Sequence, residues 1–382
     1  MKRAIFYSIT LFFCLIGAFL AGYLIRGENF NFQDRQLPVL NQAHNLLQKH
    51  GLIEVPDDRT LEYGMIRGML QAYADPYSIL VEPAQHELEM NNLQGDFGGI
   101  GVDLEKDADG KVFLFPFPDS PAEKADVLDG DQLFAVDDLV IEPLTPLDSI
   151  LAAIRGNEGE PVNLTIGRAP DFKPMKRKVI REIFPLPSIT SQIHPQENRL
   201  GIIKVNLIAT STPEEISLAF TDLRKQGATH FALDLRDNSG GLLSAGIDTA
   251  KMFLSEGTIL QQQYKGKEVD TISVENPGEL ADVPLVVLIN HSTASAAEII
   301  AGALKQNHRA RLIGEPSYGK DTIQLVFDLE DGSSLHITSA KWWIPGLLPP
   351  VGGNGIQPDK MITQNAADSD AMIEAARLYF FP

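Results

Sequence analysis

Cysteine is almost absent from this chain of 382 residues: the single one, Cys14, lies inside an apolar N-terminal run. One cysteine excludes a disulfide within the chain, and its position in the apolar run excludes a cysteine nucleophile. Metal-binding patterns are lacking too. The eight histidines show no ligand spacing, and the segment after His86 lacks the second histidine of a zinc-protease helix. We therefore predict no metal site and no cofactor.

Basic residues are scarce beside acidic ones. The chain has 32 Lys and Arg against 51 Asp and Glu, which gives a formal net charge of −19. Nucleic acid requires a basic footprint on its partner, so this balance excludes nucleic acid as the expected partner. The acidic excess is more typical of solubility than of a particular function. The length predicts two to three domains with ample core.

What the N-terminus does have is a long apolar run. Residues Ala4 to Ile25 carry no charge, and Lys2 and Arg3 precede them. A helix of this length would span about 33 Å, enough for the roughly 30 Å hydrocarbon layer. The positive-inside rule then leaves the N-terminus in the cytoplasm and sends the rest across the membrane. We expect an uncleaved anchor; the alternative is a cleaved signal peptide, although Ala18 to Ala21 lacks a clean cleavage site.

The middle of the chain changes its pattern twice. Leu40–Leu52 and Leu61–Tyr73 have helical spacing and predict a small packing cap, which ends at Asp75-Pro76. From Gly95 on, the pattern is mostly short strands and turns with one or two helices, one of them at Leu147–Ile154, which predicts a small β-barrel module. The basic segment Lys173 to Lys178 and the prolines after it predict an exit hinge. From Leu200 on, strands and helices alternate in an α/β pattern.

Two turns follow apolar strands of the α/β region. Asn238–Gly241 follows the strand at 231–235, and Asn290–Ser295 follows the strand at 285–289. Because sites in open α/β sheets lie at the carboxyl ends of strands, we expect these two turns to face one another.

Ser295 and Lys320 are the strongest candidates for chemistry. Ser295 begins a capping-box pattern that ends at Glu298, so it is either a simple N-cap or an exposed nucleophile, and the two interpretations are compatible. Lys320 is either a solvated lysine or the general base of a Ser–Lys dyad. As a base its pKa must fall from about 10.4 to around 7–8, which requires burial. Strand alternation places Gln324 beside Lys320 and should point Asp321 away.

Backbone groups complete the candidate site. The turn at 238–241 is either structural or half of an oxyanion hole made by the N–H groups of Gly240, Gly241 and Ala296. The sequence from Gly98 to Gly101 is wrongly placed for a dinucleotide fingerprint but suits a nest for a peptide carboxylate, with the peptide adding as a strand. Arg168 either lies in solvent at the end of its strand or makes a contact that forms only when the C-terminal tail of another protein is bound. The predicted peptide-binding residues are Gly98, Gly99, Ile100, Gly101, Val102 and Arg168.

Together these residues resemble the C-terminal processing (tail-specific) proteases, which carry a PDZ domain. The resemblance is carried by Phe97-Gly-Gly-Ile-Gly-Val102, Asp234-Leu-Arg-Asp-Asn-Ser-Gly-Gly-Leu242, Ser295-Ala-Ala-Glu298, Gly319-Lys320, Gln324 and Gly355-Ile-Gln-Pro-Asp359. It implies that Ser295 is the nucleophile, Lys320 the base and Gln324 its orienter. Departures from the family pattern are Asp126, Asp138, Ser239, Ala297 and Asp321.

The resemblance implies an α+β multidomain fold with a ClpP/crotonase-like serine peptidase core. The expected parts are a transmembrane anchor or signal segment (1–26), a helical region (27–94), a PDZ domain (95–180), a peptidase core (181–365) and a C-terminal helix (366–382). We predict an endopeptidase of the cell envelope, catalytic outside the inner membrane, that recognises protein C-terminal tails and cleaves near them. The alternative is an inactive PDZ-bearing tether. Homo-oligomers and adaptor proteins stay open as partners.

Overall fold

The computed structural model describes residues 37–156, 158–185, 187–363 and 370–382, which form two units that divide between Ile66 and Arg67. Across these described ranges, no helix combines the length and apolar character that a bilayer span needs. The predicted anchor at residues 4–25 lies outside them.

The helical region contains two of the expected helices. Helix α2 (Pro38–His50) and helix α3 (Asp58–Tyr73) lie close to the predicted spans. The packing cap is not formed as expected, since α2 buries no residue and α3 buries only Tyr63. Met65 and Met69, on the apolar side of α3, are about half exposed.

The β-barrel module is a six-stranded antiparallel sheet around a small apolar core. Its sheet order is β3-β4-β5-β7-β8, with β6 paired to β5. The elements are β3 (Val102–Lys106), β4 (Val112–Pro116), α5 (Pro121–Lys124), β5 (Asp131–Val136), β6 (Leu139–Val140), α6 (Leu147–Ile154), β7 (Pro161–Arg168) and β8 (Lys173–Ile180).

The predicted exit hinge is wrong. Residues 173–180 form β8, which pairs with β7 along its whole length. Val179 of this strand is buried in the module's core and Met175 packs against that core, so alternate residues face inward although the segment is basic. The chain leaves the module instead through β9 (Glu182–Pro185), which pairs with β2 (Asp96–Gly99) and so joins entry to exit.

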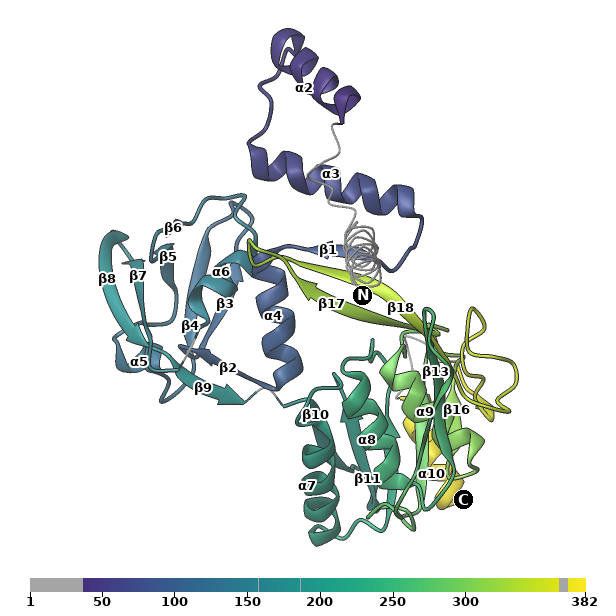
Figure 1. The fold of residues 1–382 in the computed structure, drawn as a ribbon. Helices are drawn as coiled ribbons and strands as arrows, with labels where there is room; N and C mark the ends of the chain where they lie inside the picture. The colour runs from purple at the N-terminus through teal and green to yellow at the C-terminus, as the bar shows by residue number, and fades with distance from the viewer. Residues whose placement is uncertain (1–36, 157, 186, 364–369) are drawn as a thin grey trace, which may run out of the picture. The chain divides into compact units, whose positions relative to one another are not determined.

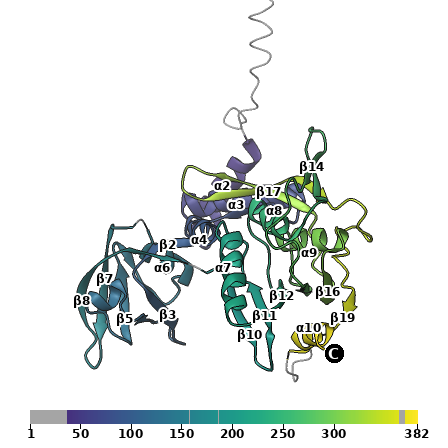
Figure 2. The same ribbon diagram turned by 90° about the horizontal axis from the view of Figure 1, so that it is seen from below.

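The α/β region is built on a sheet of order β10-β11-β12-β15-β16-β19, parallel from β11 onward. Helices α7, α8 and α9 cover one face and α10 the other (Figure 1, Figure 2). Because both faces are covered, β15 is apolar throughout and β12 is apolar between its end residues His230 and Asp234. The elements are β10 (Ile189–His194), β11 (Glu197–Val205), α7 (Thr212–Lys225), β12 (His230–Asp234), α8 (Leu243–Phe253), β15 (Leu285–Ile289), α9 (Ala296–Gln306), β16 (Arg311–Gly314), β19 (Lys360–Met361) and α10 (Ala371–Phe380).

A second sheet brings distant segments beside the α/β region. Its long strand β18 (Ser334–Trp343) pairs with β1 (Ile79–Val81), β13 (Thr258–Tyr264) and β17 (Thr322–Asp328), and β14 (Asp270–Ser273) pairs with β13. The turn before β1 therefore lies near the strand that carries Gln324. Helix α4 (Pro83–Gln94) leads from β1 into the barrel module.

Candidate active site

Ser295 stands at the turn between β15 and α9 in a strained conformation. Its φ of 54° and ψ of −120° fall in a region that residues other than glycine seldom adopt. Such strain persists where the surrounding structure imposes it, as at nucleophiles on sharp strand-to-helix turns. The predicted capping box is present at Ser295 and Glu298: the Glu298 side chain accepts the Ser295 N–H, and the Glu298 N–H donates to the Ser295 carbonyl oxygen at 2.8 Å. Ser295 therefore combines the cap position with a partly exposed place at the start of α9.

Glu298 connects the Ser295 turn to the Lys320 segment. Its side chain is fully buried, and its Oε2 accepts the N–H groups of Ser295 and Lys320, each at 2.9 Å. Its Oε1 accepts the Gly319 N–H at 2.7 Å and the Ser317 hydroxyl at 2.6 Å. Burial raises the pKa of Glu298, and these four donors oppose that rise. The sequence indicated Glu298 only as a helix cap, because the pattern says nothing of a segment so distant in the chain.

Lys320 is half-buried, and its amine contacts Gln324 and Tyr77. Its Nζ donates to Gln324 Oε1 at 2.5 Å and lies 5.3 Å from the centre of the Tyr77 ring. Gln324 in turn donates from Nε2 to the Tyr77 carbonyl oxygen at 2.6 Å. Burial lowers the pKa of Lys320, while the charges of Asp75 and Glu298 act to raise it. This is the direction that a general base requires.

The expected strand alternation is wrong in detail. Lys320 precedes β17, which begins at Thr322 and has a bulge between Ile323 and Gln324. Gln324 nevertheless reaches the Lys320 amine. Asp321 does turn to another partner, as its carboxylate pairs with Lys341 at 3.8 Å.

The glycine turn lies against Ser295, as predicted for the two facing turns. A Cβ added to Gly240 would be 2.9 Å from the Ser295 Cβ, so only glycine fits there. The Gly240 N–H donates to the Asn238 side chain at 2.8 Å and is therefore occupied. Among the described residues, the N–H groups of Gly241 and Ala296 have no such partner. The proposed oxyanion hole therefore rests on these two donors.

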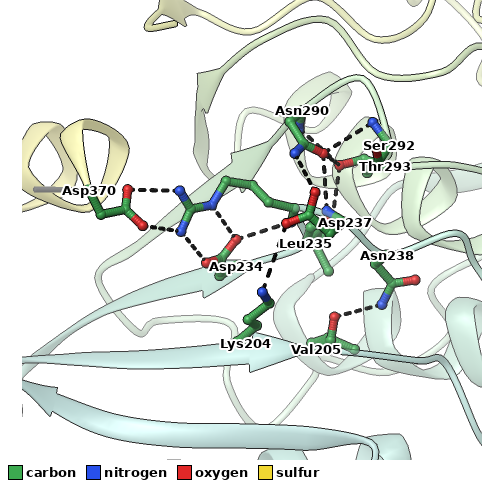
Figure 3. Close-up of polar contacts among 11 residues, drawn as sticks. Lys204, Val205, Asp234, Leu235, Asp237, Asn238, Asn290, Ser292, Thr293 and Asp370 are labelled. Carbon is green, nitrogen blue, oxygen red and sulfur yellow. Dashed lines mark hydrogen bonds and ion pairs between the residues drawn. The ribbon is translucent and has the colours of Figure 1, made fainter. Parts of the chain in front are cut away.

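A polar network fixes the two turns to each other (Figure 3). Asn290 and Asp237 exchange two hydrogen bonds, of 2.8 and 3.1 Å, and the Thr293 hydroxyl donates to the Leu235 carbonyl oxygen. Arg236 binds Asp234 and Asp370 with both ends of its guanidinium. Burial acts to lower the pKa of Arg236, but the two carboxylates outweigh burial and raise it. Through Asp370, the N-cap residue of α10, the C-terminal helix is thereby bound to Arg236 beside the glycine turn at 238–241.

The predicted tail-binding residues lie at the start of the barrel module. Ile100 is buried, its carbonyl oxygen accepts the Ala122 N–H, and Gly98 accepts the Gly156 N–H at 3.0 Å. Val102 begins β3, which stands at the end of the sheet order. In the described chain β3 pairs only with β4, so its other edge is open to an added strand.

Arg168 already has partners inside the barrel module. It holds the buried Asp131 with two hydrogen bonds of 2.8 Å and donates to the Asp126 carbonyl oxygen, without any tail present. Asp126 itself has a φ of 61°, which explains why the PDZ pattern usually has glycine there. Arg177 also pairs with the Asp126 carboxylate. The contact of Arg168 is thus already formed inside the module.

The comparisons with known proteins agree with the resemblance. Residues 199–362 match the model of peptidase family S41, and residues 118–168 match a PDZ domain. The carboxyl-terminal-processing protease of Picosynechococcus sp. is 35% identical over 307 residues, 79% of this chain and 73% of that protein. The chain belongs to the carboxyl-terminal-processing protease family. It is a serine-type peptidase with a PDZ domain.

The chain is also similar to two further proteins. The carboxy-terminal processing protease CtpA of Bacillus subtilis is 32% identical over 83% of this chain and 69% of its own length. The solved structure of a photosystem II D1 C-terminal processing protease is 28% identical, with a TM-score of 0.47 over 85% of this chain and 86% of that one.

Proposed function

We propose that this protease cleaves peptide bonds with a Ser–Lys dyad, in which Ser295 is the nucleophile and Lys320 the general base. The observation that carries the proposal is the strained Ser295 at the start of α9, held by the same carboxylate oxygen as the backbone of Lys320. The lowered pKa of Lys320 supports its role as a base. In the described residues, the Lys320 Nζ is hydrogen-bonded to Gln324 rather than to Ser295.

The proposed reaction follows from these positions. Neutral Lys320 takes the proton of the Ser295 hydroxyl, and Oγ attacks the scissile carbonyl carbon. The N–H groups of Gly241 and Ala296 stabilise the resulting oxyanion, aided by the helix dipole of α9. Lys320 then gives its proton to the leaving amine, and water, activated by Lys320, hydrolyses the acyl-enzyme. Because a base must lie about 2.6–3.2 Å from the proton donor's heavy atom, the Nζ must approach Ser295 Oγ. One of its N–H groups can stay on Gln324 Oε1 while the nitrogen lone pair accepts the serine proton.

We further propose that the PDZ domain binds the C-terminal tail of the protein substrate. The support is a backbone nest at Ile100 and Gly101, where Gly101 has a φ of 68°, and the edge of β3 that follows it. Gly98 and Gly99 are instead paired with β9 as part of β2. A tail would add as a strand along β3 and place its carboxylate on the nest.

One experiment tests both proposals. The chain from residue 37 onward is incubated with an unstructured protein, as wild type, Ser295→Ala and Lys320→Arg. We expect cleavage by the wild type alone, since guanidinium cannot act as a base near neutral pH. Cleavage at the wild-type rate by Lys320→Arg would remove lysine from the mechanism. Tail binding by all three proteins with cleavage by none would favour the tether.

We also propose an envelope location, with residues 4–25 as the anchor and the peptidase outside the inner membrane. The uncharged run after Lys2 and Arg3 supports this orientation. Alkaline extraction of membranes from cells that express the full chain tests it. We expect the protein to stay with the membrane, and release into the supernatant would contradict the anchor.

A further inference from the structure

One short turn supplies two of the groups that surround the Lys320 amine, Asp75 and Tyr77. The residues Asp75 to Ser78 lie between α3 and β1, far from Lys320 in the sequence. The Tyr77 ring faces the Nζ at 5.3 Å, and the Tyr77 carbonyl oxygen holds the amide of Gln324 that binds this Nζ. The charge of Asp75 acts on Lys320 as well.

The turn is held firmly in this position. The Asp75 carboxylate accepts the Tyr77 N–H at 3.3 Å and the Ser78 hydroxyl. The buried Ser78 hydroxyl in turn accepts the Thr338 N–H from β18 at 3.2 Å. Because β17, which carries Gln324, also pairs with β18, the turn and the glutamine share one support. The position of the Tyr77 ring relative to Lys320 is therefore fixed by the sheet rather than by a mobile loop.

We propose that Asp75 and Tyr77 are positioning residues of the general base: together they fix where the Lys320 amine rests and favour its charged form. An aromatic face attracts an ammonium ion but not a neutral amine. A nearby carboxylate favours the ammonium ion in the same way. Burial opposes both, so their balance sets the pH at which the lysine becomes available to Ser295. This inference rests on the proposed dyad.

Of the charged groups around Lys320, Asp75 is the one whose charge can be removed to test its effect on the lysine. Glu298 on α9 is the second carboxylate that acts on Lys320, but its four hydrogen bonds make it part of the fold. On β18, burial lowers the pKa of His336, with Glu89 opposing this and the charges of His86 and Lys320 adding to it. Burial therefore disfavours a charge on His336. Burial and Tyr318 raise the pKa of Tyr77, which keeps its phenol neutral.

The test is the dependence of kcat/KM on pH for Asp75→Asn, Tyr77→Leu and Tyr77→Phe. Asparagine removes the charge and can keep both contacts of the turn, with Oδ1 accepting the Tyr77 N–H and Nδ2 donating to the Ser78 hydroxyl oxygen. Loss of a nearby opposite charge lowers a lysine pKa by about 1 unit, so we expect the rise of activity to move to lower pH by about that amount. Tyr77→Leu should move it in the same direction, because leucine keeps the site dry but cannot attract the ammonium. Tyr77→Phe keeps ring and carbonyl and should match the wild type.

Asp331→Asn is the matched control. This carboxylate also accepts a backbone N–H and a serine hydroxyl, both from Ser333, but lies in the turn between β17 and β18. It should leave the pH profile unchanged. The pH dependence of Ser295 labelling by a fluorophosphonate gives a second readout that needs no peptide substrate, and circular dichroism reports folding. If Lys320→Arg is inactive but Asp75→Asn and Tyr77→Leu follow Asp331→Asn in both readouts, this inference fails alone. If Lys320→Arg is active, the dyad itself fails.

Discussion

Ser295 and Lys320 donate their backbone N–H groups to one and the same oxygen, Oε2 of Glu298. Two segments that meet only in the folded chain are thus fixed by one fully buried carboxylate. The arrangement fixes the position of the proposed nucleophile relative to the backbone of its base before any substrate binds. Preorganisation of this kind lowers the cost of reaching the reactive geometry.

The first prediction concerns this carboxylate. Glu298→Gln keeps the size of the side chain but replaces one accepting oxygen with an amide that cannot accept, so buried donors lose their partner. We expect the free energy of unfolding to fall by about 3 kcal/mol and kcat to fall by more than the loss of folded protein explains. Denaturant titration and steady-state kinetics measure both. Glu256→Gln, at an exposed glutamate, is the control, and equal stability of the two variants would contradict the role of Glu298.

How far the sequence predicts this site depends on the range of each interaction. Ser295, Lys320 and Gln324 could be identified because each stands in a local pattern. The carboxylate bridge from Glu298 to the Lys320 backbone and the contact of Tyr77 with Gln324 could not, because they join segments far apart in the chain. Backbone N–H groups also carry no residue signature.

The barrel module shows the same limit in the fold. Most of its strands follow from alternation, and the helix at Leu147–Ile154 has the predicted bounds. The strand β8 was missed because its basic residues and the prolines after it suggested a hinge, while Val179 supplies only a short apolar signal. The contacts of Arg168 could not be predicted either. It binds the buried Asp131, and the position of Arg168 at the end of a strand does not indicate this partner.

The second prediction concerns pH. Because the pKa of Lys320 is lowered by burial, the folded chain releases this proton at lower pH than the unfolded chain does. The activity should therefore rise with pH through the lowered lysine pKa, below the ordinary value of about 10.4. A profile of kcat/KM against pH for the free enzyme checks this. A flat profile from pH 6 to 10, in an enzyme that stays folded, would contradict lysine as the base.

The third prediction concerns Arg168. Arg168→Ala should destabilise the PDZ domain by about 2 kcal/mol, because the buried Asp131 loses its two hydrogen bonds to the guanidinium. We expect an earlier unfolding transition in calorimetry of the full chain, whether or not a tail peptide is present. Lys173→Ala removes an exposed ion pair with Asp171 and serves as the control, with little effect on the transition. Unchanged stability with loss of tail binding would instead restore the predicted contact with the tail.

The fourth prediction concerns the tie between Arg236 and the C-terminal helix. Asp370→Asn should keep the N-cap of α10, since an amide oxygen still accepts the N–H groups of Met372 and Ile373, but it loses the charge that binds Arg236. Because Asp370 is partly exposed, we expect a loss of only about 1 kcal/mol in denaturant titration. Asp248→Asn, which removes an exposed ion pair with Lys251, is the control and should cost less. Equal losses would show that the charge of Asp370 adds nothing to the tie.

The last prediction separates backbone strain from crowding at Gly240. Gly240 and Gly227 have similar φ values, 109° and 104°, so alanine strains the backbone at either position. An added Cβ meets nothing within 4 Å at Gly227 but lies 2.9 Å from the Ser295 Cβ at Gly240. We expect both variants to lose about 1 kcal/mol of stability, while only Gly240→Ala loses kcat, by about 100-fold, because a shift of the nucleophile by a fraction of an ångström disrupts attack. Steady-state kinetics of the two variants, measured under conditions in which the same fraction of each is folded, distinguishes strain from crowding. If Gly240→Ala keeps the kcat of Gly227→Ala, the glycine turn does not position Ser295, and the proposed oxyanion donor at Gly241 loses its support.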